Sequence, residues 1–118
     1  MNKLSADEIP TLTVTEQKSI YKLKERLSEI FHLRSLILFG SKARGDYEES
    51  SDVDVLVLVD DDKDWSSREK LSDITFEINL EYDTQFTCIL ENSKNWEEEG
   101  IWLPLKDNIV REGIVIEV

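Results

Sequence analysis

Two short apolar runs separated by a polar, turn-rich stretch constrain the fold of this sequence most. The runs are SLILF (residues 35–39) and VDVLVLV (residues 53–59), and SKARGDYEESSD lies between them. Apolar runs of this length that begin and end at glycine or charged residues are typical of buried strands. Because the connection is short, we expect an antiparallel pair, which brings the end of the first strand and the start of the second to one rim of a sheet. One helical turn is expected near residues 42–44.

Helical patterns lie on both sides of this pair. Thr13 and Glu16 have the spacing of a capping box, and apolar residues then recur at helical period, which predicts a helix over residues 14–32. Residues 66–81 are ambiguous, because their apolar positions fit either a helix or an alternating strand. Their helix-forming composition favours a helix, with Ser66 or Ser67 as its cap.

The remaining segments complete an alternating order. We expect residues 1–12 to be a loose lead-in, TQFTCIL (84–90) to be a third strand, and residues 93–99 to form a short helix. Gly100 and Pro104 break the chain, LPLKDNIVRE favours another helix, and GIVIEV a terminal strand. The order predicts an α/β (α+β) fold, a small mixed sheet flanked by helices, in a single domain over residues 1–118.

Composition restricts the cell compartment and the partners. With 118 residues, of which 40% are hydrophobic, the chain can bury one modest core. It has no apolar run of about 18 residues and no signal-peptide pattern, so we expect a cytoplasmic protein. The single cysteine, Cys88, stands in an apolar run and is interpreted as a buried structural residue. The net charge of −12 argues against duplex nucleic acid. It suits a basic protein partner or carboxylates around a metal ion, and equally a surface that only maintains solubility.

Asp52 and Asp54 are the strongest candidates for chemistry. Side chains two residues apart on a strand project to the same face, so both carboxylates can reach one site. Two like charges on a sheet raise each other's pKa, and a divalent cation removes that conflict. Hard oxygen ligands favour Mg²⁺, which binds one or two carboxylates together with substrate phosphates. Asp-x-Asp taken alone also fits a solvated strand end.

Gly40 and Ser41 are the second candidate pair. Glycine lets the backbone approach a phosphate closely, and a turn that opens a helix directs N–H groups toward an anion. Ser41 adds a hydroxyl donor. Arg44 and Lys42 follow closely and either contact a triphosphate or acceptor, or balance neighbouring carboxylates.

The combination resembles a known signature. Gly40-Ser41, Ala43-Arg44-Gly45 and Asp52-Val53-Asp54 are similar to the motif of the minimal nucleotidyltransferases of the DNA polymerase beta superfamily, most strongly over residues 20–60. The resemblance implies a nucleotidyltransferase fold and transfer of a nucleoside monophosphate, with ATP and Mg²⁺ as cofactors. It implies that Gly40, Ser41 and Arg44 hold the nucleotide, and that Asp52 and Asp54 are catalytic and bind the metal.

The resemblance also suggests a partner. Members of this size accompany a small HEPN ribonuclease toxin, and the transferase acts as an antitoxin that adds AMP to a tyrosine of that toxin. Two other functions stay open: a non-catalytic subunit that masks a basic toxin, and a transferase for a small hydroxylated molecule. The last is disfavoured, because the chain has no room for a second substrate-binding domain.

One feature departs from the family pattern. Fuller members carry a third carboxylate on the next core strand, whereas TQFTCIL contains none. Asp83 precedes this run with the parity of Gln85 and Thr87, and either approaches the site or is a solvated turn residue. His32 is interpreted as a favourable imidazole at a helix end. Trp65, Trp96 and Trp102 are too dispersed for a base-stacking platform and are interpreted as packing residues or part of a partner surface.

Overall fold

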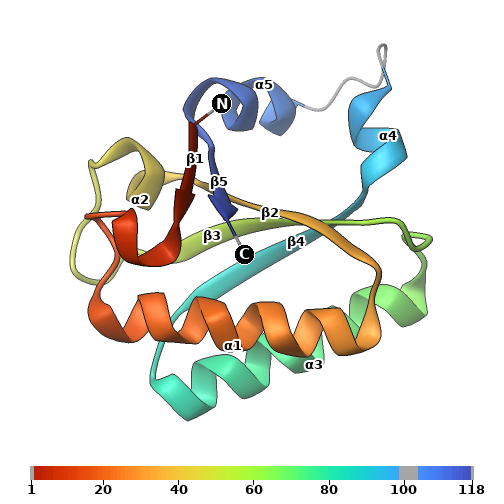
Figure 1. Cartoon of the computed structure of the whole chain (residues 1–118), viewed down its shortest axis with the longest axis horizontal. Coiled ribbons are helices and arrows are strands. Elements are labelled where there is room, and N and C mark those ends of the chain that lie inside the picture. Colours follow the sequence, from red (N-terminus) through yellow and green to blue (C-terminus); the bar gives the residue numbers. More distant parts are fainter. Residues whose placement is uncertain (1, 99–103, 118) are drawn as a thin grey trace.

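A computed structural model describes residues 2–98 and 104–117, and it has a five-stranded mixed sheet with helices on both faces (Figure 1). The strands are β1 (Asn2–Ser5), β2 (Leu33–Phe39), β3 (Val53–Val59), β4 (Phe86–Asn92) and β5 (Ile114–Glu117). The helices are α1 (Val14–Ile30), α2 (Ser41–Arg44), α3 (Trp65–Tyr82), α4 (Ser93–Glu97) and α5 (Pro104–Glu112). The predicted mixed α/β class is confirmed.

The strands lie in the order β1-β5-β2-β3-β4. Strand β2 pairs antiparallel with β3 and with β5, whereas the β1–β5 and β3–β4 pairs are parallel. The predicted antiparallel pairing of residues 35–39 with 53–59 is therefore confirmed, with Phe39 opposite Asp54.

The prediction of a loose lead-in over residues 1–12 is wrong. Residues 2–5 form β1 at the edge of the sheet, and a 3-10 turn, η1 (Ala6–Glu8), follows. Ala6, Ile9 and Leu12 are buried in the core. The segment is too short to show a period, and it is ordered by tertiary burial and by the distant β5 rather than by local propensity.

The predicted helices are present. Thr13 and Glu16 form the expected capping box of α1. The ambiguous segment is the helix α3, but Asp64, rather than Ser66 or Ser67, caps it by accepting a hydrogen bond from the Ser67 N–H. Only the residues that fit the helical pattern are buried, namely Leu71, Ile74 and Ile78, and the alternating positions Phe76 and Leu80 are exposed.

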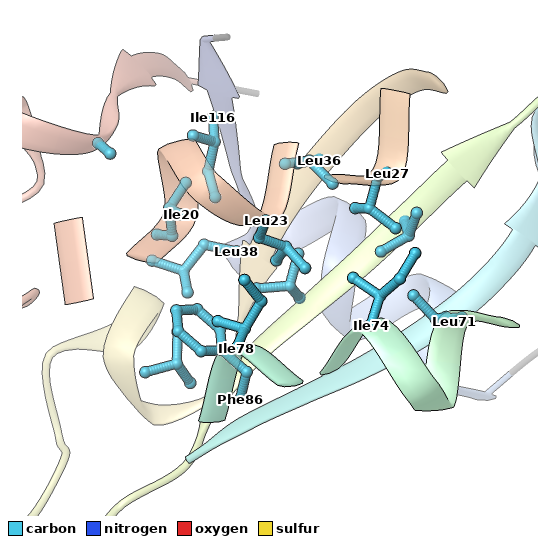
Figure 2. Close-up of a cluster of buried hydrophobic side chains, with 14 of the residues drawn as sticks. Ile20, Leu23, Leu27, Leu36, Leu38, Leu71, Ile74, Ile78, Phe86 and Ile116 are labelled. Carbon is cyan, nitrogen blue, oxygen red and sulfur yellow. The ribbon is translucent and has the colours of Figure 1, made fainter. Parts of the chain in front are cut away.

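The larger core lies between the sheet and the pair α1 and α3, and we call this side of the sheet the closed face. Figure 2 shows side chains from both helices meeting Leu36 and Leu38 of β2 and Phe86 of β4. Residues of alternate parity point to the opposite side, the open face, where Ile37, Phe39, Leu56 and Leu58 form a smaller cluster with Ile109 of α5. A strand alternates its side chains between faces, so β2 and β3 contribute to both clusters.

The C-terminal third follows the predicted order. Helix α4 ends at Glu97, and Gly100 and Trp102 lie outside the described residues. Pro104 begins α5 rather than only breaking the chain, because proline has no N–H to lose at a helix start. None of the described helices is both long and apolar enough to span a membrane.

Candidate active site at the open rim of the sheet

The antiparallel β2–β3 pair brings the glycine turn against an aspartate. Gly40 follows β2 with φ 74° and ψ −158°, a backbone conformation that side-chain-bearing residues rarely adopt. A Cβ placed on Gly40 would lie only 2.2 Å from Asp54 Oδ2. The absence of a side chain therefore allows the turn and the carboxylate to touch, and Ser41 begins α2 next to them.

Asp52 and Asp54 lie on the same face of the sheet. Thr87 of β4 is opposite Asp54 in the parallel register, and its hydroxyl donates to Asp52 Oδ2 at 3.2 Å. Gln85, with its amide nitrogen turned toward the carboxylate, donates to Asp52 Oδ1 at 3.2 Å and to the Ser50 carbonyl at 3.0 Å. Both carboxylates have the parity of Leu56, so they lie on the open face.

Asp54 is the carboxylate of this pair whose charge is the less well stabilised. Burial, followed by the nearby charge of Asp52, raises the pKa of Asp54, and Arg44 partly offsets this effect. Among the described residues, no N–H or hydroxyl donates a hydrogen bond to its carboxylate. A half-buried carboxylate without a donor, beside a second carboxylate on the same face, is a set of hard oxygen ligands that fits a divalent cation such as Mg²⁺.

The strand next to β3 contributes neutral donors rather than a third carboxylate. Asp83 adopts a left-handed conformation (φ 54°) as the C-cap of α3, which is the solvated-turn alternative. Within residues 2–98 and 104–117, no group of three His, Cys, Asp or Glu side chains could hold a metal ion. The possibility that Asp83 completes the metal site therefore finds no support, and Asp52 instead accepts hydrogen bonds from Thr87 of β4 and from Gln85, which precedes β4.

The two cations after the glycine turn have different surroundings. Lys42 has only 3% of its side chain exposed and reaches Glu16 of α1 at 3.3 Å and the ring of Tyr47 at 4.2 Å. It also donates to the Thr11 carbonyl. The sequence interpretation placed Lys42 against a triphosphate, an acceptor or the neighbouring carboxylates, whereas the lysine pairs with the distant Glu16 and links α2 to α1. It is therefore not free to contact a triphosphate.

Arg44, by contrast, remains at the rim. Its Nε donates to both oxygens of Asp46 at 3.1–3.2 Å, and its Nη1 donates to both oxygens of Glu112 at 3.1–3.3 Å. Glu112 Oε1 also accepts from the Gly40 N–H at 3.2 Å. The sequence interpretation missed Glu112, because it lies about 70 residues downstream and its only local signal is a glutamate before Gly113 at a helix end.

The other singled-out residues lie elsewhere. The backbone N–H of His32 donates to Asp61 at 2.7 Å, and the imidazole lies 3.3 Å from the same carboxylate, at the far end of β3 from Asp54. Burial raises the pKa of the Cys88 thiol to about 11, so it stays protonated at neutral pH and is not a nucleophile. Trp65 is exposed, and Trp96 packs against the smaller core cluster.

A rim with paired aspartates against a glycine–serine turn, on a mixed sheet of this order, is the arrangement expected of a nucleotidyltransferase. The family model described as "Nucleotidyltransferase domain" matches residues 20–115, and the chain belongs to this family. The resemblance to the minimal nucleotidyltransferases is thereby confirmed.

Individual relatives agree with this assignment. A "Putative protein adenylyltransferase" of Methanocaldococcus jannaschii is 30% identical over 105 residues, which cover 87% of this chain and 99% of the relative. One chain of a mutant of the toxin–antitoxin pair MntA-HepT has a TM-score of 0.57 and 22% identity, covering 83% of this chain and 71% of the other. A chain of a toxin–antitoxin with AMP-PNP has a TM-score of 0.56 and 24% identity, covering 81% and 68%. At these identities the solved structures support the fold.

Proposed function

We propose that this nucleotidyltransferase moves AMP from ATP to a protein acceptor, and that the acceptor is a HEPN-type toxin for which the chain is the antitoxin. The observation that carries the transferase activity is the contact between the Gly40 turn and Asp54 on the face that also holds Asp52. The protein acceptor is supported by the name of the Methanocaldococcus jannaschii relative, and the toxin partner and the adenine nucleotide by the two toxin–antitoxin neighbours.

Each rim residue has a role in this proposal. Asp52 and Asp54 hold Mg²⁺, which when bound neutralises charge on the phosphate oxygens. The Gly40-Ser41 turn, through the Ser41 N–H and hydroxyl, and the Arg44 guanidinium hold the triphosphate, since such groups donate hydrogen bonds to phosphate oxygens. Thr87 and Gln85 keep the Asp52 carboxylate on the open face. The acceptor's hydroxyl oxygen forms a bond to the α-phosphorus and its proton passes to water. The bond between the α-phosphorus and the oxygen that bridges it to the β-phosphate breaks, and pyrophosphate leaves with that oxygen.

The charges at the rim favour binding of the nucleotide together with its metal ion. Arg44 pairs with Asp46 and Glu112 and its charge also acts on Asp54, with Asp52 beside Asp54, whereas Lys42 pairs with Glu16 on the other side of α2. A bare triphosphate is repelled by this excess of carboxylates. The nucleotide therefore enters together with its metal ion, and the acidic rim favours the metal complex over free ATP.

The proposal is tested by incubating the protein with α-labelled ATP, Mg²⁺ and the protein encoded next to it. We expect label on the neighbour, and Asp52→Ala or Asp54→Ala should reduce the labelling rate by at least about 100-fold, the loss typical when a charge-stabilising group is removed. Asp62→Ala is the matched control, because Asp62 is an exposed aspartate beyond the opposite end of β3 and its loss should leave labelling unchanged.

Growth assays then separate transfer from masking. If the neighbour is a toxin, the unaltered chain should neutralise it, and the Asp52 and Asp54 variants should not. Neutralisation that survives both substitutions, without label on the partner, would show that the chain acts by binding alone.

A further inference from the structure

Glu112 reaches the rim from a part of the chain that is remote in sequence. It is the last residue of α5, its side chain is 15% exposed, and its carboxylate accepts hydrogen bonds from the Gly40 N–H and from Arg44. One carboxylate thus connects the backbone of the glycine turn to the guanidinium that follows it. A group in this position either competes with a phosphate for these donors or holds them in place for it.

The packing around Glu112 favours the second role, in which its carboxylate holds the Gly40 N–H and the Arg44 guanidinium in place. One turn earlier in α5, Ile109 is fully buried in the open-face cluster. The next residue, Gly113, lies so close to its neighbours that a Cβ would be 2.4 Å from the Ile109 carbonyl oxygen and 2.9 Å from Ile37 Cγ2. The backbone that carries Glu112 is therefore fixed against β2. This packing keeps the Glu112 carboxylate beside the Gly40 N–H and the Arg44 guanidinium before any ligand arrives, as a holding role requires.

The hydrogen bonds around Gly40 and Arg44 hold the glycine turn and leave one nitrogen of the guanidinium accessible. The carbonyl of Gly40 accepts from the N–H groups of Ala43 and Arg44, both at 3.0 Å, and Glu112 takes its N–H, so both polar backbone groups of this unusual turn are held. Asp46 binds Nε of Arg44 and Glu112 binds Nη1. Among the described residues, Nη2 has no hydrogen-bond acceptor, which leaves this nitrogen for a phosphate oxygen.

We propose that Glu112 is a positioning residue of the nucleotide site: it holds the Gly40 turn in its left-handed conformation and orients Arg44 toward the phosphates. The inference rests on the proposed function, since it assigns Glu112 to the same nucleotide site. It also gives the α5–β5 segment a role in binding, although that segment contains none of the motif residues.

The first test is the affinity for Mg²⁺ with AMP-PNP, measured by calorimetry without any acceptor. Glu112→Gln keeps the size of the side chain and removes the charge, and we expect the affinity to fall about 5- to 20-fold, the range of one charge-assisted hydrogen-bond pair. Glu117→Gln, an exposed glutamate on β5, is the matched control and should change nothing. Combined with Arg44→Ala, the Glu112 substitution should weaken binding by less than the product of the two single effects, because the residues act together. Equal or tighter binding by Glu112→Gln would overturn the proposal.

The second test needs no nucleotide. Hydrogen exchange followed by NMR should show the Gly40 amide protected in the unaltered protein and exchanging at least about 10-fold faster in Glu112→Gln, while core amides of β3 keep their rates. A Gly40 amide that exchanges freely in the unaltered protein would overturn the role of Glu112 even if nucleotide binds. Failure of the unaltered protein to bind the nucleotide would instead overturn the proposed function, and with it this role.

Discussion

The two faces of the sheet differ in what covers them. On the closed face, α1 and α3 bury a continuous apolar cluster that includes alternate residues of β2, β3 and β4. On the open face, Ile109 of α5 is the buried helical residue of a cluster otherwise drawn from β2 and β3. The carboxylates Asp52 and Asp54 lie on this second face. A thinly covered face loses hydrophobic stabilisation, but it leaves charged groups accessible to metal ion and nucleotide.

The one-turn helix α2 divides its side chains between the same two sides. Lys42 is buried toward α1 and pairs with Glu16, whereas Arg44 is exposed toward α5 and pairs with Glu112. Of two cations two residues apart, one is thus buried in an ion pair and the other stays exposed at the rim, where the proposed function assigns it to the nucleotide. Burial on the closed side, rather than residue type, decides which of these two cations remains available to a ligand.

The largest expected change in the free energy of unfolding comes from truncating neighbouring side chains of β2 that point to opposite faces. Leu38→Ala removes a fully buried side chain from the closed face and should lower the free energy of unfolding by about 4 kcal/mol, because a large cluster cannot close around the cavity. Ile37→Ala removes a side chain of similar volume from the open face and should cost about 2 kcal/mol, because the smaller cluster relaxes more easily. Urea denaturation measures both, and equal losses would refute an energetic difference between the faces.

The next effect separates the two cations of α2. Lys42→Met leaves the partly buried Glu16 without its partner and should cost about 2–3 kcal/mol of stability. Arg44→Met breaks exposed ion pairs and should cost less than about 1 kcal/mol. Affinity for Mg²⁺ with AMP-PNP should change in the opposite order, falling clearly only in the Arg44 variant. A Lys42 variant that keeps its stability but loses the nucleotide would reverse the assignment.

A smaller effect compares the two glycines with positive φ. Gly45→Ala places a side chain in the left-handed helical region (φ 89°, ψ 4°) and should cost about 1 kcal/mol, whereas Gly40→Ala places one in a region essentially restricted to glycine (φ 74°, ψ −158°) and should cost about 2 kcal/mol. A Cβ on Gly45 meets nothing within 4 Å, whereas on Gly40 it displaces the Asp54 carboxylate. We therefore expect only Gly40→Ala to lose nucleotide binding. Thermal melts and calorimetry on the two variants provide the comparison, and equal binding by both would separate the turn from the site.

The smallest effect is a gain in stability. Because burial raises the pKa of Asp54, the native protein binds a proton more tightly there than the unfolded chain, so stability falls as pH rises from the ordinary carboxyl pKa through the raised one. In metal-free buffer at pH 7, Asp54→Asn should add about 0.5–1.5 kcal/mol, as relief of functional strain often does. At pH 3, below both pKa values, the gain should vanish. Added Mg²⁺ should stabilise only the unaltered protein; a variant less stable at both pH values would contradict this account.

Most elements were predictable because their signals are local. The capping box of Thr13 and Glu16 fixes the start of α1, and the uninterrupted apolar run at residues 55–59 of β3 indicates a strand covered on both faces. The shared rim of Gly40 and Asp54 was expected from the antiparallel pairing of β2 with β3, which brings the end of one strand to the start of the other.

The missed features all depend on distant partners. Strand β1 exists because β5 pairs with it, and the apolar residues of that N-terminal segment are buried by the core. Lys42 pairs with Glu16 of α1, and Glu112 accepts from the Gly40 N–H before α2. Residues adjacent in sequence do not predict either contact. The third carboxylate was sought at Asp83 from strand parity, but α3 continues to Tyr82 and its left-handed cap places Asp83 in a turn instead.

The pairing of β1 with β5 joins the two extremes of the described chain, and β5 in turn completes β2. During folding, α1, β2, β3 and α3 can assemble first, because their contacts are comparatively close in sequence, whereas β5 must find partners about 80 and 110 residues away. The last strand then closes the sheet and delivers Glu112 to the glycine turn in a single event. Completion of the proposed nucleotide site therefore depends on the pairing between the segments most distant in sequence, and a partly folded molecule is a scaffold without a finished cradle.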